Sequence, residues 1–256
     1  MTLQTTRPRP APPPAATRST EPKERAPDAR RKRHWAWIAA AFPFAFSVPF
    51  LLADQLDLNR DLFYGLYALA VAGFVAAWAH DTRLTRRDFT RNWRWGLALG
   101  AAAAVLLAFI VLRTEDATAR PGGIELAAAL LWRGVLYGIT DGVLLSVFPI
   151  LAVFAAFAGT RLRQRVAGKV LIGTIAMVAS IGITASYHLG YSDFRSGKVR
   201  KPIVGDVVWS APTLLTLSPL GAPIAHAGLH VSAVLHSYET DTFLPPHPSE
   251  QAPANP

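Results

Sequence analysis

The chain has 256 residues, of which 51% are hydrophobic and 17% charged, and it contains no cysteine. Without cysteine it can form neither disulfide bonds nor thiolate metal sites. The formal net charge is +9, but the basic residues lie in the N-terminal arm and in short segments between apolar runs. This distribution favours the positive-inside rule and argues against a nucleic-acid partner. We expect an all-α, polytopic transmembrane helix bundle whose immediate partner is the membrane lipid bilayer.

The N-terminal segment, residues 1–34, is rich in proline, alanine, threonine and arginine. Such a composition cannot bury enough apolar surface to fold, so we expect a disordered basic tail. Four basic residues precede the first apolar run: Arg30, Arg31, Lys32 and Arg33. Basic residues beside a membrane span favour the cytoplasm. We therefore expect a multi-pass protein of the bacterial plasma membrane, with its N-terminus in the cytoplasm.

The expected transmembrane helical domain covers residues 35–238 and a polar C-terminal tail covers residues 239–256. The apolar runs of the domain are residues 35–53, 62–79, 95–112, 124–159, 170–187, 203–217 and 221–236. At about 1.5 Å per residue, the fourth run is too long for one crossing of a core about 30 Å thick. We therefore expect two short helices there, broken near residues 138–142.

This division gives about eight apolar segments and about seven or eight membrane crossings. Eight crossings would place the basic residues 161–169 outside, against the positive-inside rule. If one short segment is re-entrant, residues 195–201 lie outside instead. The sequence leaves both arrangements open.

Ionisable residues within the apolar runs are the main candidates for a functional site. His226 and His230 are four residues apart, so on a helix they share one face at a separation of about 5–6 Å. His188 ends another apolar run that is rich in small residues, which allow helices to approach closely. We expect these three histidines to line one chamber together with Arg133.

Arg133 lies in the run LLWRGVLYG, with apolar residues on both sides. A buried guanidinium needs a carboxylate, backbone carbonyls or water as its partner. Glu125 and Asp141 each lie about two helical turns away along the same run, and they are the expected local partners.

Three short motifs, in this order, resemble those of the CPBP intramembrane protease family, named for CAAX prenyl proteases and bacteriocin-processing proteins. The family motifs are Glu-Glu-x-x-x-Arg, Phe-x-x-x-His and His-x-x-x-Asn. LLWRGVLYG is similar to the segment around the motif arginine, here Arg133. SYHLGY is similar to the second motif, with His188, and SPLGAPIAHAGLH to the third, with His226. The resemblance covers residues 124–236, the expected protease-like core.

The chain departs from the family pattern at four positions. Ala128 and Ala129 occupy the glutamate positions, Thr184 the phenylalanine position and His230 the asparagine position. A general base must be able to take a proton, and alanine cannot. Glu125, one helical turn earlier, or a histidine is the expected substitute. The catalytic set that the resemblance implies is therefore Glu125, Arg133, His188, His226 and His230.

Three functions remain open at this point. The first is an active endopeptidase that uses activated water, needs no cofactor and cleaves a membrane-associated peptide or protein substrate. The second is a non-catalytic relative that binds a membrane peptide or lipid. The third is a membrane protein in which the three histidines and Glu125 bind a divalent metal, since imidazole and carboxylate are zinc ligands. Against the third, the sequence shows no carboxylate near His226 or His230 that would orient them. A transporter is disfavoured because the sequence shows no inverted repeat.

Overall fold

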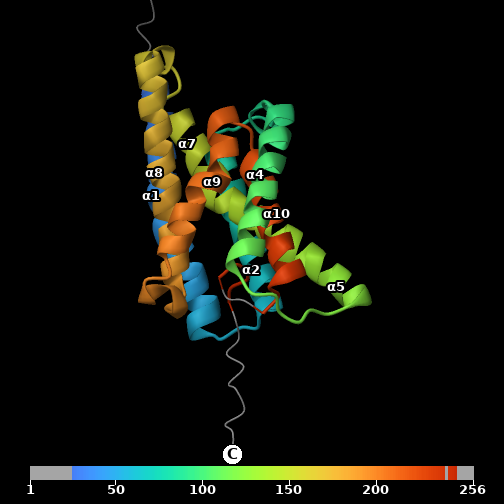
Figure 1. Ribbon diagram of the computed structural model, residues 1–256. Helices are drawn as coiled ribbons and strands as arrows, with labels where there is room; N and C mark the ends of the chain where they lie inside the picture. The colour runs from blue at the N-terminus through green and yellow to red at the C-terminus, as the bar shows by residue number, and fades with distance from the viewer. Residues whose placement is uncertain (1–24, 240–241, 247–256) are drawn as a thin grey trace, which may run out of the picture.

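The structure is a computed structural model that describes residues 25–239 and 242–246. These residues fold into helices joined by turns and loops, and no strand occurs among them. This confirms the all-α prediction. Helices α1 (Arg25–Pro49) and α8 (Val166–Gly190) lie side by side along one edge of the bundle (Figure 1).

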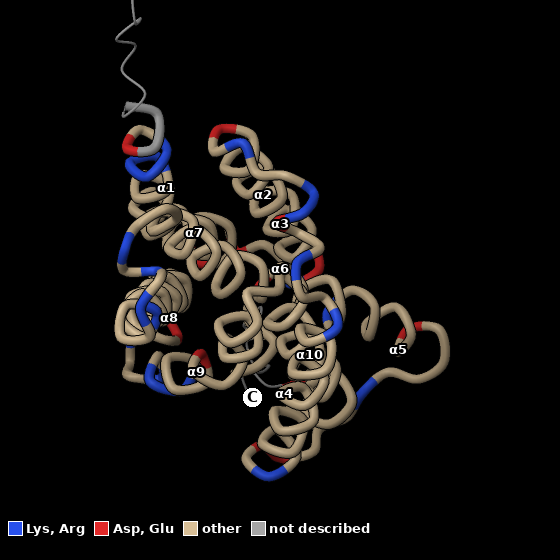
Figure 2. The backbone as a smooth tube through the Cα atoms, turned by 90° about the horizontal axis from the view of Figure 1, so that it is seen from above, with Lys and Arg blue, Asp and Glu red and all other residues tan. Residues whose placement is uncertain are grey.

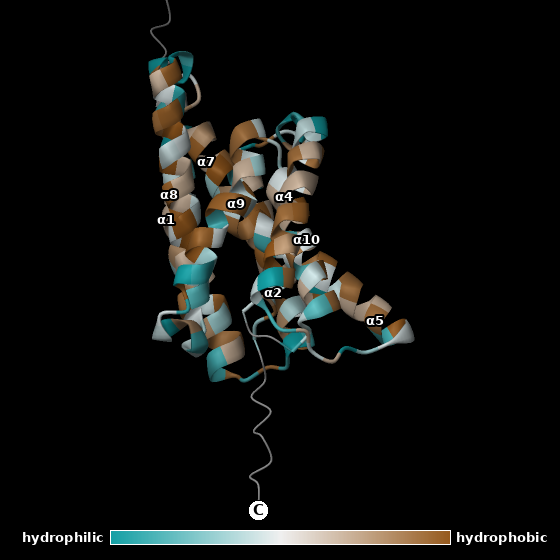
Figure 3. Ribbon diagram, in the orientation of Figure 1, coloured by the Kyte–Doolittle hydropathy of each residue, from teal (hydrophilic) through white to brown (hydrophobic). Residues whose placement is uncertain are grey.

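Five helical stretches are long and apolar enough to cross a membrane, which supports a membrane protein with transmembrane helices. Hydrophobic residues dominate the middle of these helices, and hydrophilic residues gather mostly at their ends (Figure 3). The stretches are Asp28–Gln55, Arg60–Asp81 (α2), Trp93–Thr114 (α4), Gly123–Ala156 and Val166–Gly190 (α8). The expected count of seven or eight crossings is therefore not confirmed.

The two remaining long helices, α9 (Arg200–Thr216) and α10 (Gly221–His236), run between the same two ends of the bundle as α4. The end of α9 lies beside the start of α4, where Asn92 Nδ2 donates to the carbonyl oxygen of Thr216 at 2.6 Å. The end of α10 lies beside the end of α4, where His236 Nε2 bonds the carbonyl oxygen of Glu115 at 3.0 Å. α10 packs along α4 for much of its length.

The expected break near residues 138–142 is wrong, because Gly123–Ala156 is one continuous helical stretch. It comprises α5 (Gly123–Ala129), a π-helical turn (Leu130–Leu136), α6 (Tyr137–Asp141), a second π-helical turn (Gly142–Val147) and α7 (Phe148–Ala156). Figure 1 shows α5 projecting away from the bundle.

The glycines in this stretch allow close packing and do not end the helix. A Cβ atom added at Gly138 would lie 2.6 Å from Cα of Ala227, and one at Gly142 would lie 2.5 Å from Cα of Pro223. Both contacts are with α10, so the missing side chains let the two backbones approach each other. Because Gly138 lies one residue beyond Tyr137 and three before Asp141, this close approach positions α6 against the histidine face of α10.

The expectation that residues 1–34 are disordered is wrong for its last part, since α1 begins at Arg25. His34 is fully buried and accepts a hydrogen bond from Trp78 Nε1 at 3.2 Å. Arg33 forms an ion pair with Asp81 at 3.2 Å. These contacts with α2 extend the helix beyond the apolar run. Residues 1–24 lie outside the described part of the chain.

The expected polar tail from residue 239 also contributes to the bundle. We call residues 242–246 the C-terminal strap. Its Leu244 is fully buried, and the carbonyl oxygen of Pro246 accepts a hydrogen bond from Arg60 Nε at 2.9 Å. The folded domain therefore does not end at residue 238.

Lysine, arginine, aspartate and glutamate lie mostly at helix ends and in the connecting loops (Figure 2). The Arg33–Asp81 pair brings the loop after α2 to the end of the bundle where α1 starts. The rings of Trp35 and Phe157 are in edge contact at 5.9 Å, which brings the loop after α7 to the same end. The basic segments 83–94 and 161–169 therefore share one end of the molecule.

Candidate functional site

A partly open chamber of about 460 Å³ lies between α4, α6, α8, α9, α10 and the C-terminal strap. Its walls are mainly apolar side chains from α4 and α9, including Leu107, Ile110 and Val208. Val204 also lines the chamber, and its side chain is 69% exposed on the outer surface of α9. The chamber thus reaches the apolar outer surface of the bundle beside α9.

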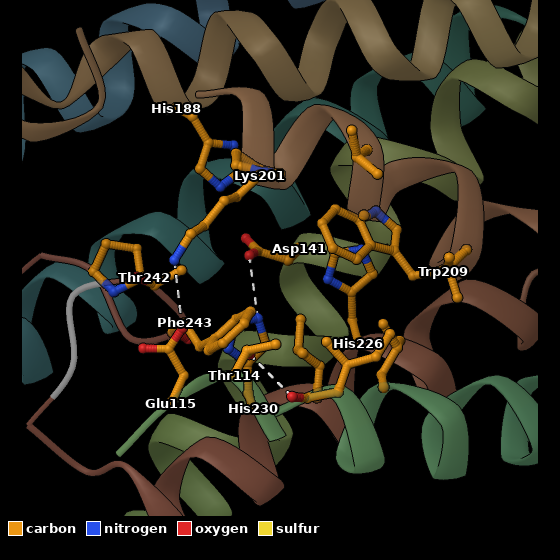
Figure 4. Close-up of a pocket in the computed structure, with 18 of the residues that line it drawn as sticks. Thr114, Glu115, Asp141, His188, Lys201, Trp209, His226, His230, Thr242 and Phe243 are labelled. Atoms are coloured by element: carbon orange, nitrogen blue, oxygen red, sulfur yellow. Dashed lines mark hydrogen bonds and ion pairs between the residues drawn. The ribbon is translucent and has the colours of Figure 1, made fainter. Parts of the chain in front are cut away.

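Four polar side chains from three helices converge in this chamber (Figure 4). They are Asp141 at the end of α6, His188 near the end of α8, and His226 and His230 on α10. Their exposed fractions are only 3%, 7%, 1% and 4%, respectively. The helical spacing holds the rings of His226 and His230 nearly parallel, 25° apart, with a centroid distance of 6.1 Å.

Asp141 and His230 face each other across the chamber. His230 Nε2 lies 3.5 Å from Asp141 Oδ2, while Asp141 Oδ1 accepts a hydrogen bond from the Tyr67 hydroxyl at 2.8 Å. The other ring nitrogen of His230, Nδ1, lies 2.5 Å from the carbonyl oxygen of Phe243 in the strap. A carbonyl can only accept, so Nδ1 carries the proton and Nε2 faces the aspartate.

His188 is held in a similar way. Its Nδ1 donates to the carbonyl oxygen of Thr184, one turn earlier on α8, at 2.8 Å. Its ring also contacts Phe194 edge-on at a centroid distance of 4.9 Å. With Nδ1 engaged by the backbone, Nε2 is the nitrogen of His188 that is free to act as an acceptor.

His226 is the least satisfied of these side chains. Its ring packs against the Trp209 ring at a centroid distance of 4.6 Å. Neither of its ring nitrogens has a hydrogen-bond partner among the described residues, although both are buried.

The predicted convergence of His188, His226 and His230 is confirmed, but the prediction that Arg133 shares their chamber is wrong. Arg133 and Glu125 instead line a second cavity, of about 410 Å³. The other residues around that cavity are Asp61, Pro121, Ala128, Ala129, Trp132 and Tyr238.

The expected partners of Arg133 are also wrong. Its guanidinium makes two hydrogen bonds to the Asp61 carboxylate, at 2.7 and 2.6 Å, and a third to the Tyr238 hydroxyl at 2.6 Å. Asp61 lies in the first turn of α2 and is half-exposed. A long side chain that reaches a carboxylate near the end of the bundle keeps its charge close to water, which costs less than burial among the helices.

Sequence reasoning missed Asp141 as a member of the chamber and treated it only as a partner for Arg133. The expectation that His226 and His230 lack a nearby carboxylate is therefore wrong. Asp141 is far from them in the sequence, but it lies on α6, which packs against α10. The available signal was an aspartate inside an apolar run, which is rare unless it has a partner.

A second buried carboxylate, Asp206, lies behind the chamber wall. Its Oδ1 accepts hydrogen bonds from Thr184 at 2.9 Å, Trp209 Nε1 at 2.9 Å and Ser210 at 3.1 Å. Because Thr184 also supports His188 and Trp209 packs on His226, this cluster connects the positions of two chamber histidines.

Comparison of the chain with models of known families, with curated proteins and with solved structures finds no match.

Proposed function

We propose that the protein is an integral membrane endopeptidase of the CPBP type, in which Asp141 takes the place of the missing motif glutamates. The observation that carries this proposal is the convergence of Asp141 and three histidines in one apolar chamber of a bundle with five candidate membrane spans. Buried titratable groups that face one another in a cleft are a frequent arrangement of catalytic sites.

The arrangement supports hydrolysis by activated water. The Asp141 carboxylate takes one proton from a water molecule while the water oxygen adds to the carbonyl carbon of a peptide bond. The C–N bond then breaks, and that proton passes to the departing amine. The products are a carboxylic acid and an amine, the acid then gives its proton to the amine, and the Asp141 carboxylate is regenerated. The imidazoles orient the water and stabilise the oxyanion.

The apolar walls support a substrate from the membrane. Chamber residues such as Leu107, Ile110 and Val208 offer little that binds a polar peptide, but they match an apolar segment. Within this proposal, Arg133 and Glu125 belong to a separate cavity and have no catalytic role.

The test uses the full chain in proteoliposomes with a set of membrane-spanning peptides, and mass spectrometry detects new peptide ends. Asp141→Asn should reduce cleavage by at least about 100-fold, because a general base contributes about 10²–10⁴-fold. Glu125→Gln is the matched control, since it makes the same carboxylate-to-amide change in the second cavity, and it should cleave like the wild type.

Equal cleavage by Asp141→Asn and wild type would exclude Asp141 as the base. Binding of the peptides without cleavage by any form would instead favour the non-catalytic binding function.

A further inference from the structure

We infer that Asp141, His226 and His230 bind one divalent transition-metal ion of the zinc type. The inference deepens the proposed function, on which any catalytic use of the ion rests, whereas ion binding can be measured without a substrate. With an ion bound, Asp141 would act as a ligand, and His188 would take its place as the acceptor of the water proton. One ligand atom from each of these residues lies within 4.8 Å of the others, and all three side chains are buried. Ligand atoms around a tetrahedral zinc lie about 3.3 Å apart. Modest rotations of the three side chains would therefore bring their ligand atoms within bonding distance of one ion.

The hydrogen bonds of His230 prepare it as a ligand. Since Nδ1 donates to the Phe243 carbonyl oxygen, Nε2 is the ring nitrogen directed at Asp141 Oδ2, 3.5 Å away. Metal-bound histidines commonly donate their second ring nitrogen to a carbonyl in this way, which fixes the tautomer and the ring orientation.

His226 provides the second independent observation. Its side chain is 1% exposed and neither ring nitrogen has a partner among the described residues. A buried polar group without a partner is costly, because it has lost its hydrogen bonds to water. Coordination of an ion between His226, His230 and Asp141 would satisfy one of these nitrogens.

The charge of the site also favours a divalent cation. Within the described part of the chain no lysine or arginine pairs with Asp141, and the chamber lysine, Lys201, is paired with Glu115 at 3.5 Å. The Asp141 carboxylate therefore has no lysine or arginine in the described structure that balances its charge, and a divalent ion would do so.

The ligand types select among ions. Two imidazoles and one carboxylate suit zinc and neighbouring first-row metals, whereas calcium and magnesium prefer sets of oxygen atoms. Three protein ligands leave the fourth position open for water, as in catalytic zinc sites. His188 lies outside the three-residue set but lines the same chamber, where its Nε2 can accept a hydrogen bond from that water.

The experiment uses the full chain in detergent, purified through a tag without histidine, stripped with chelator and then loaded with Zn²⁺ or Co²⁺. We expect about one ion per chain by elemental analysis, and visible absorption bands typical of tetrahedral Co²⁺. Excess Mg²⁺ or Ca²⁺ should not displace the ion. Asp141→Asn, His226→Gln and His230→Gln should each weaken binding at least about 100-fold, since even residues that only orient ligands contribute about 10–100-fold.

The matched controls are His80→Gln and His236→Gln, which remove histidines that do not line the chamber and should keep one ion per chain. Loss of folding is separated from loss of a ligand by thermal unfolding. Zn²⁺ should raise the midpoint of the wild type and of both controls, but not that of Asp141→Asn, because a ligand that binds only the folded state stabilises it.

These experiments distinguish failure of the metal-site inference from failure of the proposed endopeptidase function. Stripped wild type that takes up neither Zn²⁺ nor Co²⁺, or ligand variants that bind like the wild type, would overturn the metal site. Cleavage of the peptides by chelated, metal-free protein would show that the ion has no catalytic use, while the proposed endopeptidase function would stand. A wild type that binds one ion and cleaves nothing would leave the metal site and remove the endopeptidase.

Discussion

Arg133 and the chamber histidines show how the burial of a polar side chain depends on its partners. Arg133 keeps its charge by reaching Asp61 and the Tyr238 hydroxyl at one end of the bundle. His226 and His230 lie deeper, at 1% and 4% exposure, in the chamber that also holds the buried Asp141. The guanidinium thus stays near one end of the bundle, and the imidazoles occupy the interior.

This separation predicts the effect of Arg133→Lys. A lysine keeps the positive charge but cannot form the bidentate pair of hydrogen bonds that the guanidinium makes with the Asp61 carboxylate. Because Asp61 is half-exposed, we expect a loss of about 1 kcal/mol, seen as a fall of about 2–4 °C in the thermal midpoint.

The same variant should retain the bound ion and any cleavage, because Arg133 does not line the histidine chamber. Loss of cleavage at an unchanged thermal midpoint would instead return Arg133 to the catalytic set that the motif resemblance implies.

At the scale of the helices, the site depends on how closely α6 and α10 pack. The hydrogens of Gly138 and Gly142 leave room for the backbone of α10 at Ala227 and Pro223. The carboxylate on α6 and the imidazoles on α10 approach each other only because no Cβ atom separates these helices.

Gly138→Ala should therefore disturb the site without touching any of its side chains. The added methyl group would lie 2.6 Å from Cα of Ala227, so the helices must separate. We expect a loss of about 1–3 kcal/mol of stability, typical of overpacking, and weaker Co²⁺ bands at equal protein concentration.

Gly73→Ala is the matched control for this change. Gly73 lies on the exposed face of α2, with nothing within 4 Å of the added atom. We expect unchanged stability, or a gain of up to about 1 kcal/mol from the higher helix propensity of alanine. Equal behaviour of the two variants would show that close packing at Gly138 does not control the site.

The elements themselves were largely predictable. Apolar runs gave the helical class and the approximate position of the long helices, because the periodicity and length of such runs are local properties. The continuity of Gly123–Ala156 was not predictable, since a glycine that ends a helix and one that allows close packing look alike without knowledge of the neighbouring helix. The pairing of His230 with Asp141 likewise depends on tertiary contacts between distant segments.

The whole molecule has an asymmetric distribution of charge between its two ends. With Gly123–Ala156 as one stretch, the basic segments 83–94 and 161–169 lie at the end where α1 starts. At the other end, Arg195 is paired with Asp54 at 3.1 Å and Lys201 with Glu115 at 3.5 Å. The other end also carries Lys198 and Arg200, but the basic residues are more numerous at the end where α1 starts, and by the positive-inside rule we expect that end to face the cytoplasm.

Single cysteines can test this orientation directly, since the natural chain has none. Ala117→Cys, in the loop after α4, should react with a membrane-impermeant maleimide on intact cells. Ala158→Cys, in the exposed loop after α7, should react only after the cells are opened. The reverse pattern would invert the topology, and labelling of both on intact cells would contradict a crossing by Gly123–Ala156.

Val204, which lines the chamber and is also 69% exposed on the outer face of α9, has a consequence for any ligand of the site. We expect the outer face of α9 to lie against lipid, so a compound that arrives there comes from the hydrocarbon, and its concentration in lipid, and not in buffer, sets the occupancy of the chamber. Each added methylene favours transfer into lipid by about 0.8 kcal/mol, or about fourfold. In a homologous series of amphiphiles, the half-saturating dose in buffer should fall by that factor per carbon, even if the contacts with the protein stay the same.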